Sequence, residues 1–198
     1  MAATLHSRDV VSRPRFARLS LAQYHAMILA GVLSEDDSVE LMDGFLVTKM
    51  PKSPRHVQVV RRLQRLLASL LPPDWTAIKE DPITLTDPRT TVGSEPEPDI
   101  AIVATASLDR PGQHPTADDC LLLVEVAETS VAKDRLRAGV YAAAGVPEYW
   151  IANLGLGLFE RHSKSVDGVY TRTETLESLS LVVDGRTLGP IRLSELLA

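Results

Sequence analysis

The sequence lacks the features that are typical of secreted, disulfide-stabilised and membrane proteins. Its 198 residues include a single cysteine, Cys120, so no disulfide can form within the chain. Its most strongly apolar stretch, residues 120–124, is far shorter than the about 20 residues that a membrane-spanning helix needs. The first residues, MAATLHSRDVVSRPRF, contain no apolar segment of the kind found in secretory signals. We therefore expect a cytoplasmic protein with no membrane partner, in which Cys120 is a small buried residue rather than a nucleophile.

Positive charge is also scarce. The chain has 21 Lys and Arg residues against 26 Asp and Glu residues, giving a net charge of −5, whereas proteins that bind a phosphate backbone are usually basic. This balance argues against avid DNA binding but permits a local basic surface, and a bound divalent cation would offset part of the acidic excess. Residues 49–65 form such a basic segment, because they include no acidic residue. Its basic residues are Lys49, Lys52, Arg55, Arg61, Arg62 and Arg65, with His56 among them.

The rest of the composition is that of an ordinary folded protein. Hydrophobic residues make up 44% and charged residues 24%, and the length fits one domain with a full hydrophobic core. The first residues are polar and show no periodic pattern. We therefore expect a flexible tail over residues 1–17 and a single domain over residues 18–198.

Helical patterns occur at four places. Residues 20–31 begin with Ser20 and Gln23 at capping-box spacing. Residues 53–71 form a long amphipathic pattern, which Ser53 can cap and which the following prolines end. Residues 131–144 and residues 193–197 complete the set. The expected buried face of the long helix consists of Val57, Val60, Leu63, Leu67, Leu70 and Leu71.

Strand patterns account for much of the remainder. Residues 39–50 predict a hairpin around Asp43-Gly44, a two-residue turn of the kind that needs positive φ. Residues 121–126 are apolar except for Glu125, which suits a central strand covered on both faces. The predicted fold class is α/β (α+β), with a mixed central sheet flanked by helices. Further strands are expected at residues 75–80, 83–86, 99–103, 148–152, 158–162, 169–173 and 179–183.

Glu125 and Asp99 are the acidic residues that point most directly to chemistry. Glu125 follows four apolar residues on the predicted central strand, where a carboxylate is costly unless it is paired, protonated or bound to metal. Asp99 opens the strand DIAIV directly after a proline. Two acids on neighbouring strands can converge on a hard cation such as Mg²⁺. The alternative is that each acid sits at a strand end and reaches solvent or an arginine.

Five segments, taken in order, resemble a known family. They are LSLAQYHAMILAGVLSEDDSVELMDGFLV, SPRHVQVVRRL, EPEPDIAIV, LLLVEVAETS and YAAAGVPEYWIAN. Together they resemble the bacterial Uma-type endonuclease family of the PD-(D/E)XK nuclease superfamily, from roughly Arg18 to beyond Asn153. The resemblance implies a restriction-endonuclease-like fold and an endonuclease that uses Mg²⁺ or Mn²⁺ to hydrolyse DNA.

The resemblance also implies roles for individual residues. Asp99 and Glu125 correspond to the paired metal ligands, with the Val126 carbonyl as a third ligand. Glu40 matches an acidic position near the site, where it would bind the metal directly or through water, or act only as a strand-end charge. His56 matches a histidine close to the carboxylates. It would contact phosphate or orient water, or make only a local hydrogen bond at the start of its helix.

The sequence departs from the superfamily pattern at its lysine. The position two residues after Glu125 is Ala127, and the alternative position on the following helix is Ala138. Allowing for a segment that is one residue short, Arg137 is the nearest equivalent. Lys133 lies four residues earlier on the same predicted helix face. Either residue could place a positive charge at the scissile phosphate, although arginine cannot act as a base.

Three functions are compatible with these residues. The first is a metal-dependent endodeoxyribonuclease; cutting both strands needs two active sites, which a homodimer would supply. The second is a catalytically impaired nucleic-acid-binding module on the same fold, because the usual lysine is replaced. The third is a partner protein without nuclease activity, in which the carboxylates are structural. Salt-sensitive DNA binding would separate the third from the other two.

Overall fold

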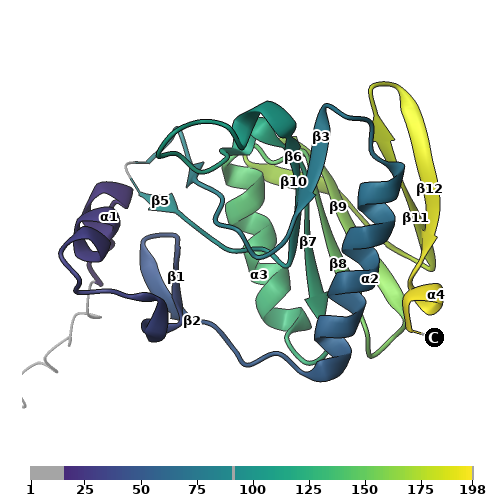
Figure 1. Cartoon of the computed structure of the whole chain (residues 1–198), viewed down its shortest axis with the longest axis horizontal. Coiled ribbons are helices and arrows are strands. Elements are labelled where there is room, and N and C mark those ends of the chain that lie inside the picture. The colour runs from purple at the N-terminus through teal and green to yellow at the C-terminus, as the bar shows by residue number, and fades with distance from the viewer. Residues whose placement is uncertain (1–15, 91, 198) are drawn as a thin grey trace, which may run out of the picture.

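A central sheet of six strands organises the molecule (Figure 1). The computed structural model describes residues 16–90 and 92–197, so most of the expected N-terminal tail lies outside the described residues. The strand order is β10-β9-β8-β7-β6-β3, with β7 and β8 parallel and the other neighbours antiparallel. The predicted mixed sheet is therefore confirmed. Its strands are β3 (Trp75–Ile78), β6 (Ile100–Ala104), β7 (Cys120–Ala127), β8 (Glu148–Asn153), β9 (Leu158–Val166) and β10 (Val169–Leu176).

The two long helices, α2 (Pro54–Leu70) and α3 (Val131–Ala143), pack on opposite faces of this sheet. Alternate residues of β7 show the division, because Leu122 and Val124 join the cluster that contains α2, whereas Leu123 joins the cluster that contains α3. A strand covered on both faces must be apolar on both, which explains the unbroken apolar run. From Leu122 onward the odd-numbered positions of β7 consequently face α3, whereas Cys120 faces α3 and Leu121 faces α2 at the irregular start of the strand.

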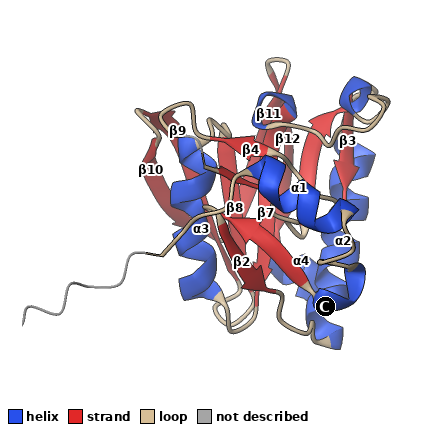
Figure 2. Cartoon of the chain, turned by 90° about the vertical axis from the view of Figure 1, so that its left-hand side faces the viewer, coloured by secondary structure: helices blue, strands red, loops and turns tan. Residues whose placement is uncertain are grey.

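The N-terminal part forms a separate layer beside the sheet, at the left of Figure 1 and facing the viewer in Figure 2. It contains α1 (Leu21–Leu29), the short 3₁₀ helix Glu35–Asp37, and the hairpin of β1 (Val39–Met42) and β2 (Phe45–Thr48). Asp43 and Gly44 both have positive φ, at 49° and 76°, as the predicted turn requires. The small pair β4 (Leu85–Thr86) and β5 (Gly93–Ser94) contacts this layer, since Glu95 bridges to Leu41 of β1.

Helix ends follow the local signals in the sequence. Ser20 caps α1 in a complete capping box with Gln23, and Ser53 caps α2 by accepting a hydrogen bond from the His56 N–H. One expectation for the buried face of α2 was wrong, because Val59 is buried while Val57 is only half-buried. Val57 instead lines a groove on the exposed side of the helix.

The C-terminal part contains a strand that the sequence patterns did not predict. After β11 (Ser178–Val183) the chain turns into β12 (Arg186–Arg192), which pairs with it, and then into α4 (Leu193–Leu197). Strand β12 carries Gly189-Pro190 in its middle, a pair that normally argues against a strand. Its Ile191 joins the core cluster on the α2 side. Two further 3₁₀ turns, Thr105–Ser107 and Ala117–Asp119, flank the loop before β7.

Cys120 begins strand β7 and is buried, as expected for a packing residue. Burial raises the pKa of its thiol to about 12, so the thiolate is not formed at neutral pH. Within the described residues, no helix is both long enough and apolar enough to span a membrane.

Candidate active site

Asp99 and Glu125 lie opposite each other on neighbouring strands. The antiparallel register of β6 and β7 pairs Ile100 with Val124, and one further step brings Asp99 opposite Glu125. Both carboxylates belong to the sheet face that α3 covers. Asp99 Oδ2 accepts a hydrogen bond of 2.8 Å from the Val126 N–H, which holds the two strand ends together.

Asp99 is a buried carboxylate that contacts Lys52 and His56. Its Oδ1 atom lies 2.9 Å from Lys52 Nζ and 3.1 Å from His56 Nε2. Burial by itself would raise the pKa of Asp99, but the hydrogen bond from His56 and the charge of Lys52 outweigh it. The pKa of Asp99 therefore lies below its ordinary value, and the carboxylate is ionised.

The pKa of Glu125 is shifted in the opposite direction to that of Asp99. It is buried, accepts a hydrogen bond of 3.2 Å from the Tyr141 hydroxyl, and lies 3.5 Å from Arg137. Burial and the neighbouring negative charge of Asp99 raise the pKa of Glu125 well above its ordinary value, against the opposing charge of Arg137. The two carboxylates thus repel each other across the strand pair, which is an arrangement that a shared cation would relieve.

Arg137 projects from α3 into the middle of this acidic group. Both terminal nitrogens of its guanidinium bond to the Glu40 carboxylate on β1, and its Nε lies 3.8 Å from Asp134 Oδ1. Glu40 also accepts a hydrogen bond of 3.2 Å from the Glu97 N–H. The Arg137 side chain is only 10% exposed, so its charge is balanced by carboxylates inside the protein rather than presented to solvent.

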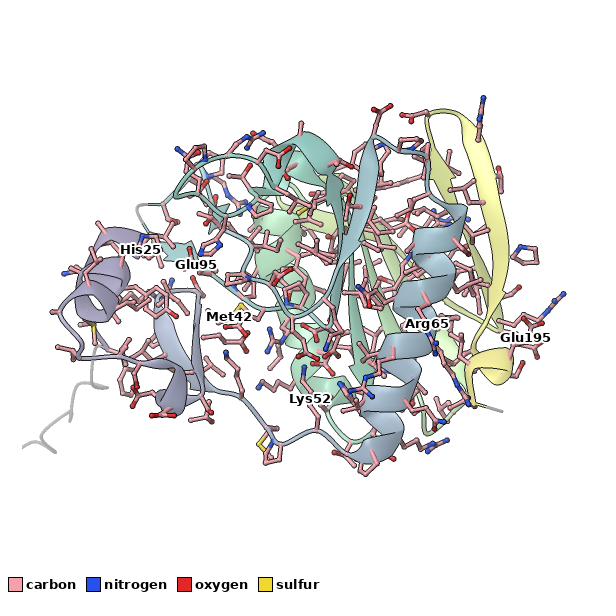
Figure 3. The ribbon with its side chains drawn as sticks, in the orientation of Figure 1. His25, Met42, Lys52, Arg65, Glu95 and Glu195 are labelled. Carbon is pink, nitrogen blue, oxygen red and sulfur yellow. The ribbon has the colours of Figure 1, made fainter. Side chains whose placement is uncertain are left out.

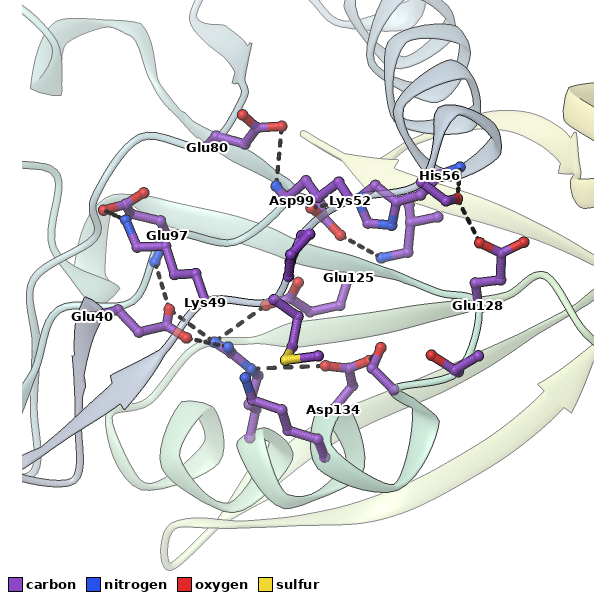
Figure 4. A pocket seen from close by; sticks show the side chains of 18 residues that line it. Glu40, Lys49, Lys52, His56, Glu80, Glu97, Asp99, Glu125, Glu128 and Asp134 are labelled. Atoms are coloured by element: carbon purple, nitrogen blue, oxygen red, sulfur yellow. Dashed lines mark hydrogen bonds and ion pairs between the residues drawn. The ribbon is translucent and has the colours of Figure 1, made fainter. Parts of the chain in front are cut away.

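These side chains surround one cavity of about 380 Å³ (Figure 4). The structure brings together every residue that the sequence predicts for the site, although Lys133 approaches only the Thr48 carbonyl, at 3.4 Å. Their grouping from five separate segments is a result of the fold, and their chemical roles stay predictions. The predicted residues that line the cavity are Glu40, His56, Asp99, Glu125, Val126, Lys133 and Arg137.

Comparison with known proteins now decides the family. A sequence model of the family described as "Putative restriction endonuclease" (Uma2) matches residues 21–193. The chain belongs to the Uma2 family. A crystal structure from Anabaena variabilis, titled as a putative nuclease belonging to DUF820, has the same fold, with a TM-score of 0.61 and 14% sequence identity. The match covers 90% of this chain and 97% of that chain. No curated protein matches the sequence.

Restriction-endonuclease-like families such as Uma2 generally use divalent metal ions. The donor set of this Uma2 chain fits such an ion, because Asp99 and Glu125 provide hard carboxylate oxygens of the type that Mg²⁺ and Mn²⁺ prefer. Among the described residues, no group of three or more His, Cys, Asp or Glu side chains is arranged to hold a metal. Mg²⁺ commonly binds through one or two carboxylates and keeps several water ligands, so a pair is sufficient.

The structure adds Lys52 to the residues that line the cavity, whereas the sequence had placed it only in the basic segment. Lys52 lies on the loop between β2 and α2 and contacts Asp99 and Glu80. Neither helical nor strand periodicity applies to a loop residue, and the only signal was its position four residues before His56. Glu80, Glu97, Glu128 and Asp134 also line the cavity without having been predicted.

A second hollow, the α2 groove, runs along the exposed side of α2 and has a volume of about 580 Å³. It shares Lys52 with the carboxylate cavity, and its lining contains no acidic residue. Arg61 and Arg65 are exposed there, with Arg65 farther along the helix from Lys52 (Figure 3). The groove is lined by Lys52, Pro54, Val57, Gln58, Arg61, Arg62 and Arg65.

Proposed function

We propose that this Uma2 protein is a divalent-metal-dependent endonuclease that hydrolyses phosphodiester bonds of DNA. The observation that carries the proposal is the pairing of Asp99 and Glu125 in a cavity that meets a basic groove at Lys52. Carboxylates alone would suit many metal sites, whereas carboxylates beside an exposed basic groove suit a polyanionic substrate.

Asp99 and Glu125 would hold Mg²⁺ or Mn²⁺, with the Val126 carbonyl as a further ligand. A bound cation of this kind polarises a phosphate oxygen and lowers the pKa of a coordinated water. His56 holds the Asp99 carboxylate in place through its contact of 3.1 Å. The pKa of Glu125 is raised first by burial and then by the negative charge of Asp99, and a bound cation would offset that charge.

The α2 groove provides the surface for the phosphate backbone. Arg61 and Arg65 lie four residues apart, which places them on one face of α2 about 6 Å apart along its axis. In the described part of the chain, neither guanidinium has a carboxylate partner. Contacts of this kind position the substrate without reading its sequence. The local basic surface thereby reconciles DNA binding with a net charge of −5.

A specific observation favours a second candidate, a catalytically impaired nucleic-acid-binding module. The residue predicted to replace the usual lysine, Arg137, is buried and bonded to Glu40. Ala127 and Ala138 occupy the two positions where the superfamily carries that lysine. Such a protein would bind DNA along α2 without cutting it.

Cleavage of supercoiled plasmid DNA in Mg²⁺ or Mn²⁺ separates these candidates. We expect metal-dependent nicking by the wild type and a loss of at least about 100-fold in Asp99→Asn and Glu125→Gln. Glu128→Gln is the matched control, because Glu128 lines the same cavity but bonds to Ser53 and Arg55. DNA binding without cleavage by well-folded wild-type protein would favour the impaired module. Direct appearance of linear plasmid without a nicked intermediate would support a homodimer with two active sites.

A further inference from the structure

The cavity contains four long basic side chains, and their surroundings differ. Arg137 forms an ion pair with Glu40 and lies near Glu125 and Asp134, and its side chain is 10% exposed. Its single positive charge is therefore shared among three carboxylates. Turning it toward a substrate phosphate would leave Glu40 buried without its partner, which is an unfavourable exchange. Arg137 consequently serves as the internal counter-charge of the site.

Lys49 and Lys133 also line the cavity, but each contacts a group other than Asp99 and Glu125. Lys49 Nζ is 2.5 Å from Glu97, and Lys133 Nζ reaches only the Thr48 carbonyl at 3.4 Å. Neither contacts Asp99 or Glu125 in the structure. Of the described basic side chains that line the cavity, Lys52 and His56 contact Asp99, whereas Arg137 contacts Glu40 and Glu125.

Lys52 combines contact with the carboxylates and access to substrate. Its ammonium lies 2.9 Å from Asp99 Oδ1 and 3.1 Å from Glu80 Oε1, and the side chain is still 34% exposed. It lines both the carboxylate cavity and the α2 groove. A backbone phosphate that follows the groove into the cavity must therefore pass this ammonium.

Glu80 fixes the position of Lys52 relative to Asp99. The Glu80 N–H donates a hydrogen bond of 3.1 Å to the carbonyl of Pro98, the residue before Asp99. Glu80 has a φ of +58°, a left-handed conformation that a non-glycine residue adopts at some cost. The strained backbone thus places a second carboxylate beside Asp99, and the two carboxylates together hold one ammonium group.

We propose that Lys52, on the loop before α2, contacts the scissile phosphate and supplies the positive charge that neither Arg137 nor Lys133 provides. This inference rests on the proposed nuclease function, because it assigns a substrate contact within that site. Lysine's compact ammonium on a flexible stem can move between Asp99 and a nearby phosphate oxygen. Glu80 acts as its positioning residue.

The test compares Lys52→Ala and Lys52→Arg with Lys79→Ala. Lys79 is a matched control, since its Nζ lies 3.2 Å from the same Glu80 carboxylate but it does not line the cavity. In Mn²⁺-dependent plasmid nicking we expect Lys52→Ala to lose about 100-fold in rate, with partial activity in Lys52→Arg. Lys79→Ala should stay within about threefold of the wild type. Thermal melting of each variant checks that it is folded.

A second readout does not depend on cleavage. Binding of a fluorescein-labelled duplex in Ca²⁺, measured by anisotropy over a range of salt, gives the number of phosphate contacts. Lys52→Ala should reduce the slope of log K against log salt by about 0.9, and Lys79→Ala should leave it unchanged.

The outcomes separate the two proposals. If the wild type cleaves and Lys52→Ala cleaves equally well, the role of Lys52 is refuted and the nuclease stands. If the wild type binds but does not cleave, a reduced slope in Lys52→Ala still supports the phosphate contact while the nuclease proposal fails. An unchanged slope in that case refutes Lys52 as well, as does a wild type that neither binds nor cleaves.

Discussion

Arg137 and Glu40 form a buried ion pair between residues 97 positions apart in the chain, with both terminal guanidinium nitrogens on the carboxylate. The pair joins α3 to strand β1 and thereby fixes the N-terminal hairpin against the edge of the cavity. Glu125 and Asp134 lie around the same guanidinium. Arg137, the predicted equivalent of the superfamily's lysine, therefore holds three carboxylates together around one guanidinium.

Arg137→Met should destabilise the protein by about 3–5 kcal/mol, because it leaves Glu40 and its acidic neighbours buried without a counter-charge. The measurement is urea denaturation in the presence of a chelator. Arg192→Gln is the control, since the Arg192–Glu195 pair is exposed and should contribute about 1 kcal/mol or less. An Arg137→Met variant no less stable than this control would contradict the role assigned to the buried pair.

Glu125 should make stability fall as the pH rises. Its pKa is raised in the folded protein, so its contribution is fully present below the ordinary pKa of about 4.3 and is lost as the pH rises through the raised value. Glu125→Gln, which cannot ionise, should therefore be more stable than the wild type at neutral pH in a chelator. The difference should shrink toward pH ~4, as measured by urea denaturation at several pH values.

The pKa of Asp119 is shifted in the opposite direction to that of Glu125. Burial alone would raise the pKa of Asp119, but its hydrogen bonds from Arg110 and Thr116 lower it. Its contribution is present above the ordinary pKa and is lost as the pH falls through the lowered value. Asp119→Asn should therefore destabilise the protein at neutral pH and lose that effect in acid. If Glu125→Gln and Asp119→Asn shifted stability in the same direction at neutral pH, the environment assigned to Glu125 would be incorrect.

Divalent cations should stabilise the folded protein through Asp99 and Glu125. A ligand at about 100 times its Kd adds about 2.7 kcal/mol to the free energy of unfolding. We therefore expect Mg²⁺ or Mn²⁺ to raise the Tm of the wild type and of Glu128→Gln, and a chelator to reverse the shift. Asp99→Asn should show no increase. An equal increase in Asp99→Asn would place the cation elsewhere on the protein.

The α2 groove should account for much of the salt dependence of DNA binding. Arg61→Gln and Arg65→Gln should each lower the slope of log K against log salt by about 0.9, with similar losses for duplexes of different sequence. The control is Arg172→Gln, which also removes one positive charge. Arg172 lies on the exposed strand β10 at the far edge of the sheet. Equal effects of all three substitutions would indicate nonspecific attraction rather than a binding groove.

Local signals in the sequence predicted much of the fold. Ser20 and Ser53 cap their helices, and Asp43-Gly44 makes the hairpin turn, because each effect depends on residues within one turn of the chain. Strand β12 was not predicted, since Gly189-Pro190 disfavours a strand locally, whereas pairing with β11 and burial of Ile191 stabilise it. For the site, the apolar run around Glu125 and the strand start at Asp99 singled out the two carboxylates, and the family resemblance predicted that they form a pair of metal ligands.

The sequence by itself determined the family, the mixed sheet and the two carboxylates, since periodicity and motif order are properties of neighbouring residues. Only the tertiary structure decided which basic side chain contacts which carboxylate. Lys52 reaches Asp99 across 47 positions, and Arg137 reaches Glu40 across 97. Such pairings depend on strand register and on how loops dock over the sheet. The spacing of charged residues along the chain carries no information about either, so the contact between Lys52 and Asp99 could not be predicted from the sequence.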